Sequence, residues 1–441
     1  MCENIKMILP SSQHPGSSFS THCSREGPAP RRLCSYKDTL SQNLKSDENG
    51  ESKSNDTEHL EGNKLLVKRR NCQDEFAPPS KSFKNDEHST VVAAHYNHLE
   101  EKGLKERFKS PIFYVRNFNN WVKSVLIQEY TDKVREKDYG KPIMVLDICC
   151  GKGGDLSKWQ KARVEKVIFA DIADVSVQQC KIRYDDLHKR CGRLYSAEFI
   201  AADCTKETLR DKYSDPSINF DLVSCQFGLH YSFESLGQAR RMLTNITECL
   251  RPGGYFFGTI PDAYEIISRT KKSADGSFGN RIYNIKLLFD SKTGYPLFGA
   301  KYDFHLEGVV DCPEFLVNFE LFVKLAAEYG LELVYKARFS DFFKDHSDNY
   351  KQLLHRIICF ESYPAPPGKE LIGDEAEYEH AKQFWENMEK KNEHDHIGTM
   401  SMCEWEVATI YMAFAFKKQK STWDSNGKPV YKLPQDEEKA E

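Results

Sequence analysis

Apolar residues are unevenly spaced along the 441-residue chain, and their spacing changes with position. From about residue 143 onward, short apolar runs of strand length alternate with segments whose apolar residues recur at helical spacing. The runs lie at residues 143–149, 166–172, 197–203, 220–228 and 255–261. Strands that alternate with helices in this way predict a mostly parallel sheet with helices on both faces, and such sheets bind ligands beyond the carboxyl ends of their strands.

The pattern is absent from the first part of the chain. Residues 1–90 contain four aromatic residues and no tryptophan, while serine, proline, asparagine and charged residues dominate. Burial in such a segment does not offset the entropy of ordering it, so we expect a disordered arm there and a folded domain over residues 91–419. Within that domain, residues 364–398 predict a charged helical lobe with room for a partner. Residues 420–441 form a polar tail without periodicity.

Composition narrows the class of protein further. The chain has 14 cysteines, but it is long and lacks an apolar leader, which favours a reduced intracellular compartment over a disulfide scaffold. The cysteine and histidine spacing does not predict a metal site, and the apolar runs are too short to predict a membrane span. A net charge of −4 argues against a protein that binds nucleic acid through phosphates alone, so any RNA must be selected by a pocket.

A basic cluster lies inside the predicted arm. Residues 64–70 read KLLVKRR, a composition that fits either a nuclear import signal or an ordinary solvated run of charge. We therefore carry nuclear localisation as an expectation.

The stretch VLDICCGKGGD, residues 145–155, points to a ligand site. An apolar strand runs into glycines and then into a helix, an arrangement that brings backbone N–H groups and a helix N-terminus close to a ligand. Cys149 occupies a position at which such loops commonly carry glycine. If the backbone there has positive φ, the side chain costs about 1 to 2 kcal/mol.

Three acids follow successive predicted strands. Asp147, Asp171 and Asp203 would therefore meet at one edge of the sheet, and Asp171 stands 20 residues after Gly151, the spacing of a ribose-binding acid. A single aspartate at such a position is more often a turn or helix-cap residue. The set fits NAD or S-adenosylmethionine. Departure from GxGxxG spacing and an acid before the loop favour the second ligand, and Asp203 could meet its adenine amine.

Seven segments, in order and without large gaps, resemble the mRNA cap guanine-N7 methyltransferases. They are YVRNFNNWVKSVLI, VLDICCGKGGDLSKW, FADIADVSVQQC, SCQFGLHYSFES, RPGGYFFGTIPD, YDFHLEGVVDCPEFLVNF and EWEVATIYMAFAFKK. The resemblance as a whole runs from about residue 91 to residue 418. The resemblance implies an α/β fold of the class I S-adenosylmethionine-dependent methyltransferases, with a Rossmann-like sheet. It also implies methyl transfer to N7 of the terminal guanosine of GpppN-capped RNA.

The resemblance assigns the site residues. It places the donor, S-adenosylmethionine, or its product S-adenosylhomocysteine, at Lys123, Asp147, Cys149, Gly151, Asp171, Asp203, Gln226 and Tyr231. Cap and RNA positions fall on Asn119, Asn120, Lys152, Lys158, Arg183, His230, Glu314 and Tyr411, with His230, Tyr231 and Glu314 positioning the reactants. Guanine N7 has a free lone pair and no proton to lose, so no residue is expected to act by proton transfer and no metal is expected.

Further alternatives stay open. A catalytically weak cap-binding or scaffolding relative fits Cys149 in place of the first motif glycine. A methyltransferase for another substrate is disfavoured by Asn119, Asn120, His230 and Glu314, and an NAD oxidoreductase is disfavoured by the loop spacing. Capped RNA is the implied substrate, and the family resemblance adds a small activating subunit and the transcription machinery as partners, without a membrane.

Overall fold

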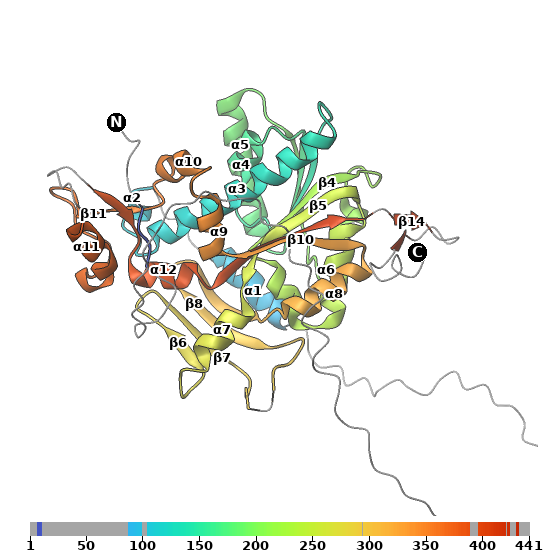
Figure 1. Ribbon diagram of the computed structural model, residues 1–441. Coiled ribbons are helices and arrows are strands. Elements are labelled where there is room, and N and C mark those ends of the chain that lie inside the picture. The colour runs from blue at the N-terminus through green and yellow to red at the C-terminus, as the bar shows by residue number, and fades with distance from the viewer. Residues whose placement is uncertain are drawn as a thin grey trace, which may run out of the picture. The chain divides into compact units, whose positions relative to one another are not determined.

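A computed structural model describes residues 7–10, 87–98, 104–292, 294–388, 396–419, 421–423 and 429–431. A seven-stranded sheet forms its centre, in the order β10-β13-β5-β4-β1-β2-β3 (Figure 1). Strands β1 to β5 run parallel, and β13 is antiparallel to both β5 and β10. Their bounds are β1 Met144–Ile148, β2 Lys166–Asp171, β3 Ser196–Ala201, β4 Phe220–Gln226, β5 Leu250–Pro261, β10 Leu331–Arg338 and β13 Tyr411–Lys418. The predicted fold class is confirmed.

Alternate residues of the sheet pack on opposite layers, which is why the central strands read as continuous apolar runs. Helices α3, α4 and α5 cover one face, and α6 and α8 cover the other (Figure 1). Val167 and Phe169 of β2 belong to the first core, whereas Ile168 and Ala170 belong to the second. The helix bounds are α3 Phe113–Lys137, α4 Leu156–Lys161, α5 Asp174–Cys191, α6 Leu236–Thr247 and α8 Phe319–Glu328.

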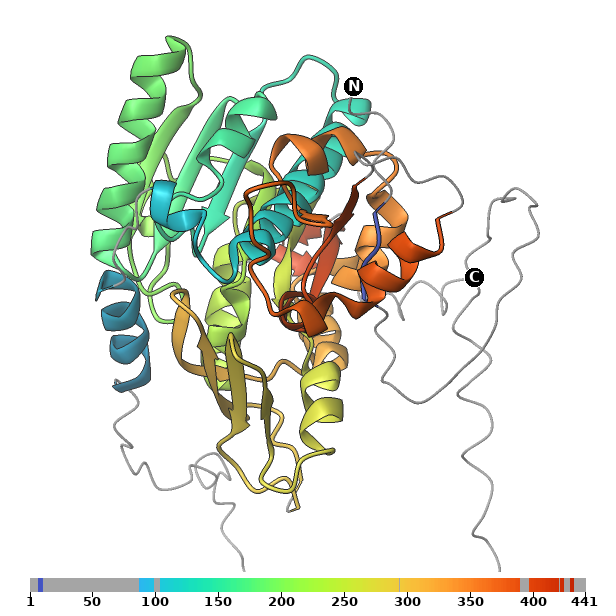
Figure 2. The ribbon, with the colours of Figure 1, turned by 90° about the vertical axis from the view of Figure 1, so that its left-hand side faces the viewer.

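An antiparallel sheet of four strands is inserted in the chain between β5 and α8 (Figure 2). Its strands are β6 Ser277–Gly279, β7 Tyr283–Leu287, β8 Lys301–Leu306 and β9 Val310–Phe315. Buried and exposed residues alternate along β7, so one face packs on the core and the other faces solvent. The sequence analysis did not predict this sheet, although it carries Glu314.

Helix α1, Glu87–His98, lies beside this inserted sheet and contacts both α5 and β9 (Figure 2). Asn97 accepts a hydrogen bond from the Val175 N–H of α5 at 3.2 Å, and the His88 ring meets Phe315 of β9 edge to face. Helix α1 begins four residues before residue 91, the predicted start of the domain.

Smaller elements complete the described chain. They are α2 Leu104–Arg107, η1 Arg210–Lys212, η2 Leu229–Glu234, α7 Ala263–Thr270, α9 Phe339–His346, α10 Lys351–Arg356, β11 Glu361–Tyr363, η3 Glu375–Tyr378, α11 Glu379–Glu386, β12 Ile397–Thr399, α12 Met402–Ala408, β14 Ser421–Trp423 and β15 Pro429–Tyr431. The predicted charged lobe thus holds the short helices η3 and α11, and two short strands frame it. Within the described chain, no helix combines the length and the apolar character needed to span a membrane.

Two local predictions differ from the structure. The strand predicted at residues 255–261 begins earlier, because residues 251–254 lie inside β5, where the pairing with β4 shifts register and Gly253 takes φ of 83°. Residues 7–10, part of the expected disordered arm, lie beside β12: Met7 bridges Gly398, and the Ile8 N–H donates to the Gly398 carbonyl at 2.9 Å. Their apolar run is too short to show a periodicity. The basic cluster at residues 64–70 lies outside the described residues.

Candidate active site

The loop between β1 and α4 has an unusual backbone. Cys149, Gly151 and Gly153 take φ of 60°, 51° and 76°, in the left-handed region that glycine tolerates best. A Cβ at Gly153 would lie 2.7 Å from Sγ of Cys180, so this position is also closely packed. The condition set out in the sequence analysis is therefore met: Cys149 has positive φ, at a cost of about 1 to 2 kcal/mol for a residue with a side chain.

The Cys149 side chain lies against β4 and the loop that follows it. A Cβ added to Gly228 would lie 2.4 Å from the Cys149 Cβ, so the glycine leaves the room that the cysteine fills. A hydrogen bond with the Cys225 thiol, together with burial, holds the pKa of Cys149 well above its usual range. The cysteine is thus a protonated packing group in this loop.

Asp171 ends β2 and fixes the same loop. Its Oδ2 accepts from the Gly151 N–H at 2.7 Å, and its Oδ1 accepts from the Ala173 N–H at 2.9 Å. Burial raises the pKa of this carboxyl, against the effect of the backbone donors. Each oxygen keeps a further acceptor position, so one carboxylate can shape the loop and still accept from a ribose hydroxyl.

A group of charged side chains connects β1, α4 and α3. Asp147 accepts from the Trp159 indole at 2.9 Å, and burial followed by the nearby Asp155 charge raises its pKa to about 7. Asp155 lies 2.8 Å from both Lys123 Nζ and Lys158 Nζ. Burial alone would raise the pKa of Asp155, but the two lysines lower it to about 2.

Two further donor-side residues also bond within the chain. Asp203 accepts from the backbone N–H and the hydroxyl of Thr205, at 3.0 and 2.6 Å, as a turn residue does. Gln226 donates to Ser224 at 3.0 Å and accepts from Thr259 at 3.1 Å. Both residues therefore lie at the carboxyl edge of the sheet. Each also has a structural role, because its side chain forms hydrogen bonds within the chain.

A second cluster surrounds Glu314, whose side chain is 3% exposed. Its Oε2 accepts from the Tyr302 hydroxyl at 2.5 Å and its Oε1 from the Tyr231 hydroxyl at 3.2 Å. Nε2 of His230 lies 3.2 Å from Oε1, although it is not aligned as a hydrogen bond. Burial would raise the pKa of Glu314, but His230 and the two tyrosine hydroxyls lower it below the ordinary value, which holds an anion in a buried pocket.

Two residues of this cluster escaped the sequence analysis. Tyr96 of α1 lies with its hydroxyl 3.0 Å from that of Tyr231, and Tyr302 comes from β8. Burial raises the pKa of Tyr96 well above the usual range. The weakly amphipathic helix α1 carried no motif, and Tyr302 is an ordinary apolar position of an alternating strand. Pairing Tyr302 opposite Glu314 across β8 and β9 would have been the only signal.

The remaining cap-side residues lie around these two clusters. The side-chain oxygen of Asn119 is buried without a partner, whereas that of Asn120 accepts from Lys158 Nζ at 2.9 Å. The Tyr411 ring meets Phe227 edge to face, with centroids 5.0 Å apart. Arg183 donates to the backbone carbonyl of Lys152 at 2.9 Å, which brings those two predicted basic residues together.

One buried acceptor near the predicted cap side has no partner within the chain. The unpartnered Asn119 oxygen is a group that a bound molecule with a donor would satisfy. Among the described residues, no three His, Cys, Asp or Glu side chains are grouped as metal ligands would be. Acids at the carboxyl edge of a parallel sheet, together with this loop, suit a ligand that carries a ribose.

Comparison with known proteins narrows the class. Residues 80–419 match the profile of the mRNA (guanine-N(7))-methyltransferase domain, and the chain belongs to this family. The mRNA cap guanine-N(7) methyltransferase of Drosophila melanogaster is 48% identical over 352 residues, which cover 78% of this chain and 80% of that protein. The protein of that name from Caenorhabditis elegans is 40% identical, over 76% of this chain and 88% of its own.

The fold is also similar to that of solved methyltransferase structures of low sequence identity. An S-adenosylmethionine-dependent methyltransferase from Clostridium acetobutylicum is 11% identical, covers 66% of this chain and 92% of its own length, and superposes with a TM-score of 0.36.

Proposed function

We propose that this enzyme transfers the methyl group of S-adenosylmethionine to N7 of the terminal guanosine of capped RNA, and that the Glu314 pocket holds the guanine. The observation that carries the proposal is a buried carboxylate kept ionised by Tyr302, Tyr231 and the nearby His230. A buried charge without such partners would cost several kcal/mol. The pocket therefore reads as a prepared acceptor for a cationic or hydrogen-donating ligand.

Guanine matches this acceptor. Its N1–H and exocyclic amine are adjacent donors that a carboxylate can accept together, whereas adenine has no hydrogen at N1. The Tyr231 and Tyr302 hydroxyls each occupy one lone pair of Glu314 and leave others free. The same geometry thus fixes the carboxylate and reads the base.

The reaction needs positioning more than proton transfer. The N7 lone pair forms a bond to the methyl carbon while the sulfur–carbon bond breaks, and the positive charge passes from sulfur to the guanine ring. The Glu314 anion faces the base that gains this charge, and a fixed anion in a water-poor pocket stabilises it. His230 and Tyr231 hold the carboxylate in place, and no residue removes a proton from N7.

The donor is assigned to the carboxyl edge of the sheet. S-adenosylmethionine supplies a methyl group on a sulfonium ion. Asp171 would accept from its ribose and Asp203 from its adenine amine, while Lys123 would meet its carboxylate. Lys123 now neutralises Asp155, so it would serve both groups.

The direct test is methyl transfer to GpppG-capped RNA, followed by digestion and identification of the methylated base. We expect 7-methylguanosine from this substrate and little product from ApppG-capped RNA. Methylation of both caps at equal rates, or of an internal base, would contradict the proposal. Tight cap binding without transfer would instead favour the scaffolding alternative, for which the comparisons give no support.

Partners and localisation extend the same proposal. A small activating subunit would fit the short-helix lobe between β11 and β12, and a nuclear role would bring the enzyme to nascent transcripts. The cluster at residues 64–70 is the candidate import signal. Replacing Lys68, Arg69 and Arg70 by alanine should shift a fluorescent fusion toward the cytoplasm, and an unchanged distribution would remove that role from the cluster.

A further inference from the structure

We infer that a cavity bounded by α3, α4 and α10 receives backbone phosphates of the RNA just downstream of the cap. The inference rests on the proposed function and adds a surface to it. The residues that carry it are Lys161 and Arg356, neither of which the sequence analysis singled out.

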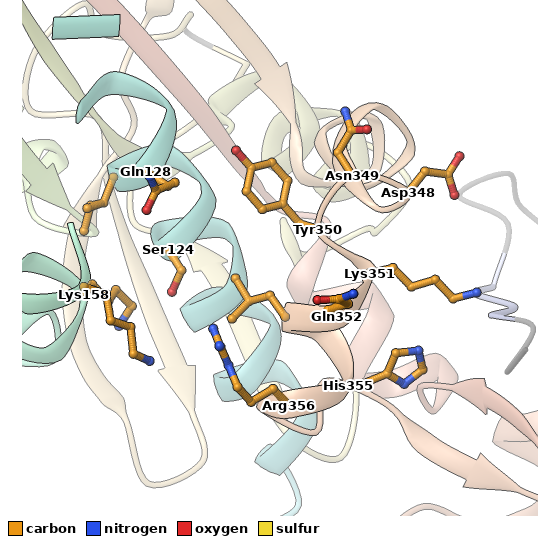
Figure 3. A pocket seen from close by; sticks show the side chains of 13 residues that line it. Ser124, Gln128, Lys158, Asp348, Asn349, Tyr350, Lys351, Gln352, His355 and Arg356 are labelled. Carbon is orange, nitrogen blue, oxygen red and sulfur yellow. The ribbon is translucent and has the colours of Figure 1, made fainter. Parts of the chain in front are cut away.

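The cavity has a volume of about 640 Å³ (Figure 3). Ser124 and Gln128 of α3 form one wall, Lys158 and Lys161 of α4 a second, and Arg356 belongs to α10 on the third side. In Figure 3 the guanidinium of Arg356 extends toward the side of the cavity that α3 and α4 form. The space is therefore lined by polar groups from three separate segments, with cations on two of them.

The charges of Lys161 and Arg356 are not compensated by the fold. Both side chains are exposed, and in the part of the chain that the structure describes neither one pairs with a carboxylate. Burial and then the charge of Arg356 lower the pKa of Lys161, so these two cations repel each other across the cavity. The carboxylate of Asp348, which also lines the cavity, points away from them in Figure 3. An anion placed between the two cations would relieve the repulsion.

The cavity continues from the predicted cap side. Lys158 lines it and also donates to the side-chain oxygen of Asn120 at 2.9 Å. Ser124, on the next turn of α3, donates to the backbone carbonyl of Asn120 at 2.7 Å. A strand of RNA that leaves a cap near Asn120 would therefore meet Lys158 first and the Lys161–Arg356 pair next.

This continuity favours RNA over an acidic peptide as the occupant. A nucleic acid brings one anion per nucleotide at regular spacing, and Arg and Lys match phosphate oxygens with charge-assisted hydrogen bonds. The contribution is local, because a chain of net charge −4 gives no general attraction for RNA.

The test compares two ligands that differ only in length beyond the cap. Binding of a GpppG-capped ten-nucleotide RNA would be measured by fluorescence anisotropy in the presence of S-adenosylhomocysteine, over a range of salt concentrations. Methylation of the free dinucleotide GpppG would be measured in parallel. The variant carries Lys161→Ala and Arg356→Ala, and a control carries Lys189→Ala and Arg190→Ala.

The control also removes one lysine and one arginine, here from the last turn of α5. Helix α5 begins close to Asp171, at the carboxyl edge of the sheet, and its last turn lies at the opposite edge. In the variant, loss of two phosphate contacts should make the slope of log affinity against log salt shallower by about 1.4. The ratio of wild-type to variant affinity should therefore be about 25-fold larger at 0.1 M salt than at 1 M salt. The control should change affinity less than about twofold, and GpppG methylation should stay near wild type in both.

Three results would overturn the inference: unchanged RNA affinity in the variant, an equal loss in the control, or a loss of GpppG methylation that matches the loss of RNA binding. Decaglutamate that binds wild type but not the variant, with RNA affinity intact in both, would assign the cavity to an acidic peptide instead. Failure of wild type to methylate GpppG would contradict the proposed function but leave the RNA-binding comparison readable.

Discussion

The donor edge and the Glu314 pocket stabilise their buried carboxylates in different ways. At the donor edge, Asp171 accepts from backbone N–H groups and Asp155 is neutralised by two lysines. In the pocket, the Glu314 anion is surrounded by hydroxyls and one imidazole, without a lysine or arginine beside it in the described structure. The first arrangement is electrically balanced before a ligand arrives. The second leaves the Glu314 carboxylate with acceptor positions for a ligand.

The two regions also differ in how far apart in sequence their parts lie. The donor loop, its strand and the acid that fixes it fall within residues 144–171. The pocket assembles Tyr96, Tyr231, Tyr302 and Glu314 from four separate elements. A local motif can preorganise a loop by itself, whereas the pocket exists only after the inserted sheet and α1 have packed together.

The largest expected effect comes from Glu314→Gln. The amide offers one acceptor oxygen in place of two and turns an N–H group toward a tyrosine hydroxyl or the guanine donors. Methylation of GpppG-capped RNA should fall by roughly 10²–10³-fold, as for loss of one electrostatic contact in a preorganised site. The affinity for S-adenosylhomocysteine, measured by calorimetry, should change little.

Glu307→Gln is the matched control, because it removes an exposed carboxylate from the turn between the same two strands. Equal loss of donor affinity in a folded Glu314→Gln protein would show that the two regions are not independent.

The second effect comes from Asp171→Ala. Two charge-assisted hydrogen bonds to the donor ribose, at roughly 1.5 kcal/mol each, would be lost, which raises the dissociation constant by roughly one to two orders of magnitude. The structure adds a cost to folding that the sequence does not reveal, because the Gly151 and Ala173 N–H groups lose their acceptor. Calorimetry should therefore be accompanied by a melting curve. Unaltered donor affinity in the folded variant would show that the donor does not bind at Asp171.

The third effect is a dependence of stability on pH that involves α3, the helix that carries Lys123 of the donor edge. Glu404 accepts from the Tyr114 and Val115 N–H groups at the start of α3, and burial raises its pKa to about 8. The folded state holds a proton that the unfolded chain releases above its ordinary pKa of 4.5. This contribution to stability is therefore complete below about pH 4.5 and is lost as the pH rises toward 8, by up to about 1.4 kcal/mol per pH unit.

Glu404→Gln keeps an acceptor for the α3 N–H groups but does not titrate. Urea unfolding at pH 5.5 and 8.0 should show a decline for the wild type that is much smaller in the variant. Parallel declines in both proteins would mean that Glu404 is ionised throughout this range.

The smallest expected effect is that of Cys149→Gly. Glycine relieves the positive φ, so we expect a gain of about 1 kcal/mol and roughly fivefold tighter donor binding. Against this, the cysteine fills the space above Gly228. Cys149→Ala separates the two influences, since it keeps the strained backbone and loses only the thiol. Weaker donor binding in the glycine variant than in the wild type would show that the loop has adapted to cysteine.

More of the donor edge than of the Glu314 pocket could be predicted from the sequence. The order of strands and helices, the positive φ at Cys149 and the position of Asp171 at a strand end follow from local patterns. The engagement of Asp203 and Gln226 by Thr205, Ser224 and Thr259 does not, because side-chain partners depend on how the sheet packs.

The pocket was reached through resemblance alone. Glu314 lies in a short strand of an alternating sheet, and its partner Tyr302 reads as an ordinary core residue of the neighbouring strand. Tyr96 belongs to a helix with little amphipathic character, so its approach to Tyr231 depends on contacts made after folding. Likewise, Arg356 lines the same cavity as Lys161 only because α10 packs near α4, and the sequence does not reveal that packing.

The central claim is that the two regions form one site, with the donor on the sheet edge and guanine on Glu314. A crystal structure with S-adenosylhomocysteine and GpppG bound together tests it most directly. The account predicts ribose hydroxyls on Asp171, the guanine N1–H and amine on Glu314, and the donor sulfur facing N7 in line. Guanine bound elsewhere, or bound with N7 turned away from the sulfur, would contradict it.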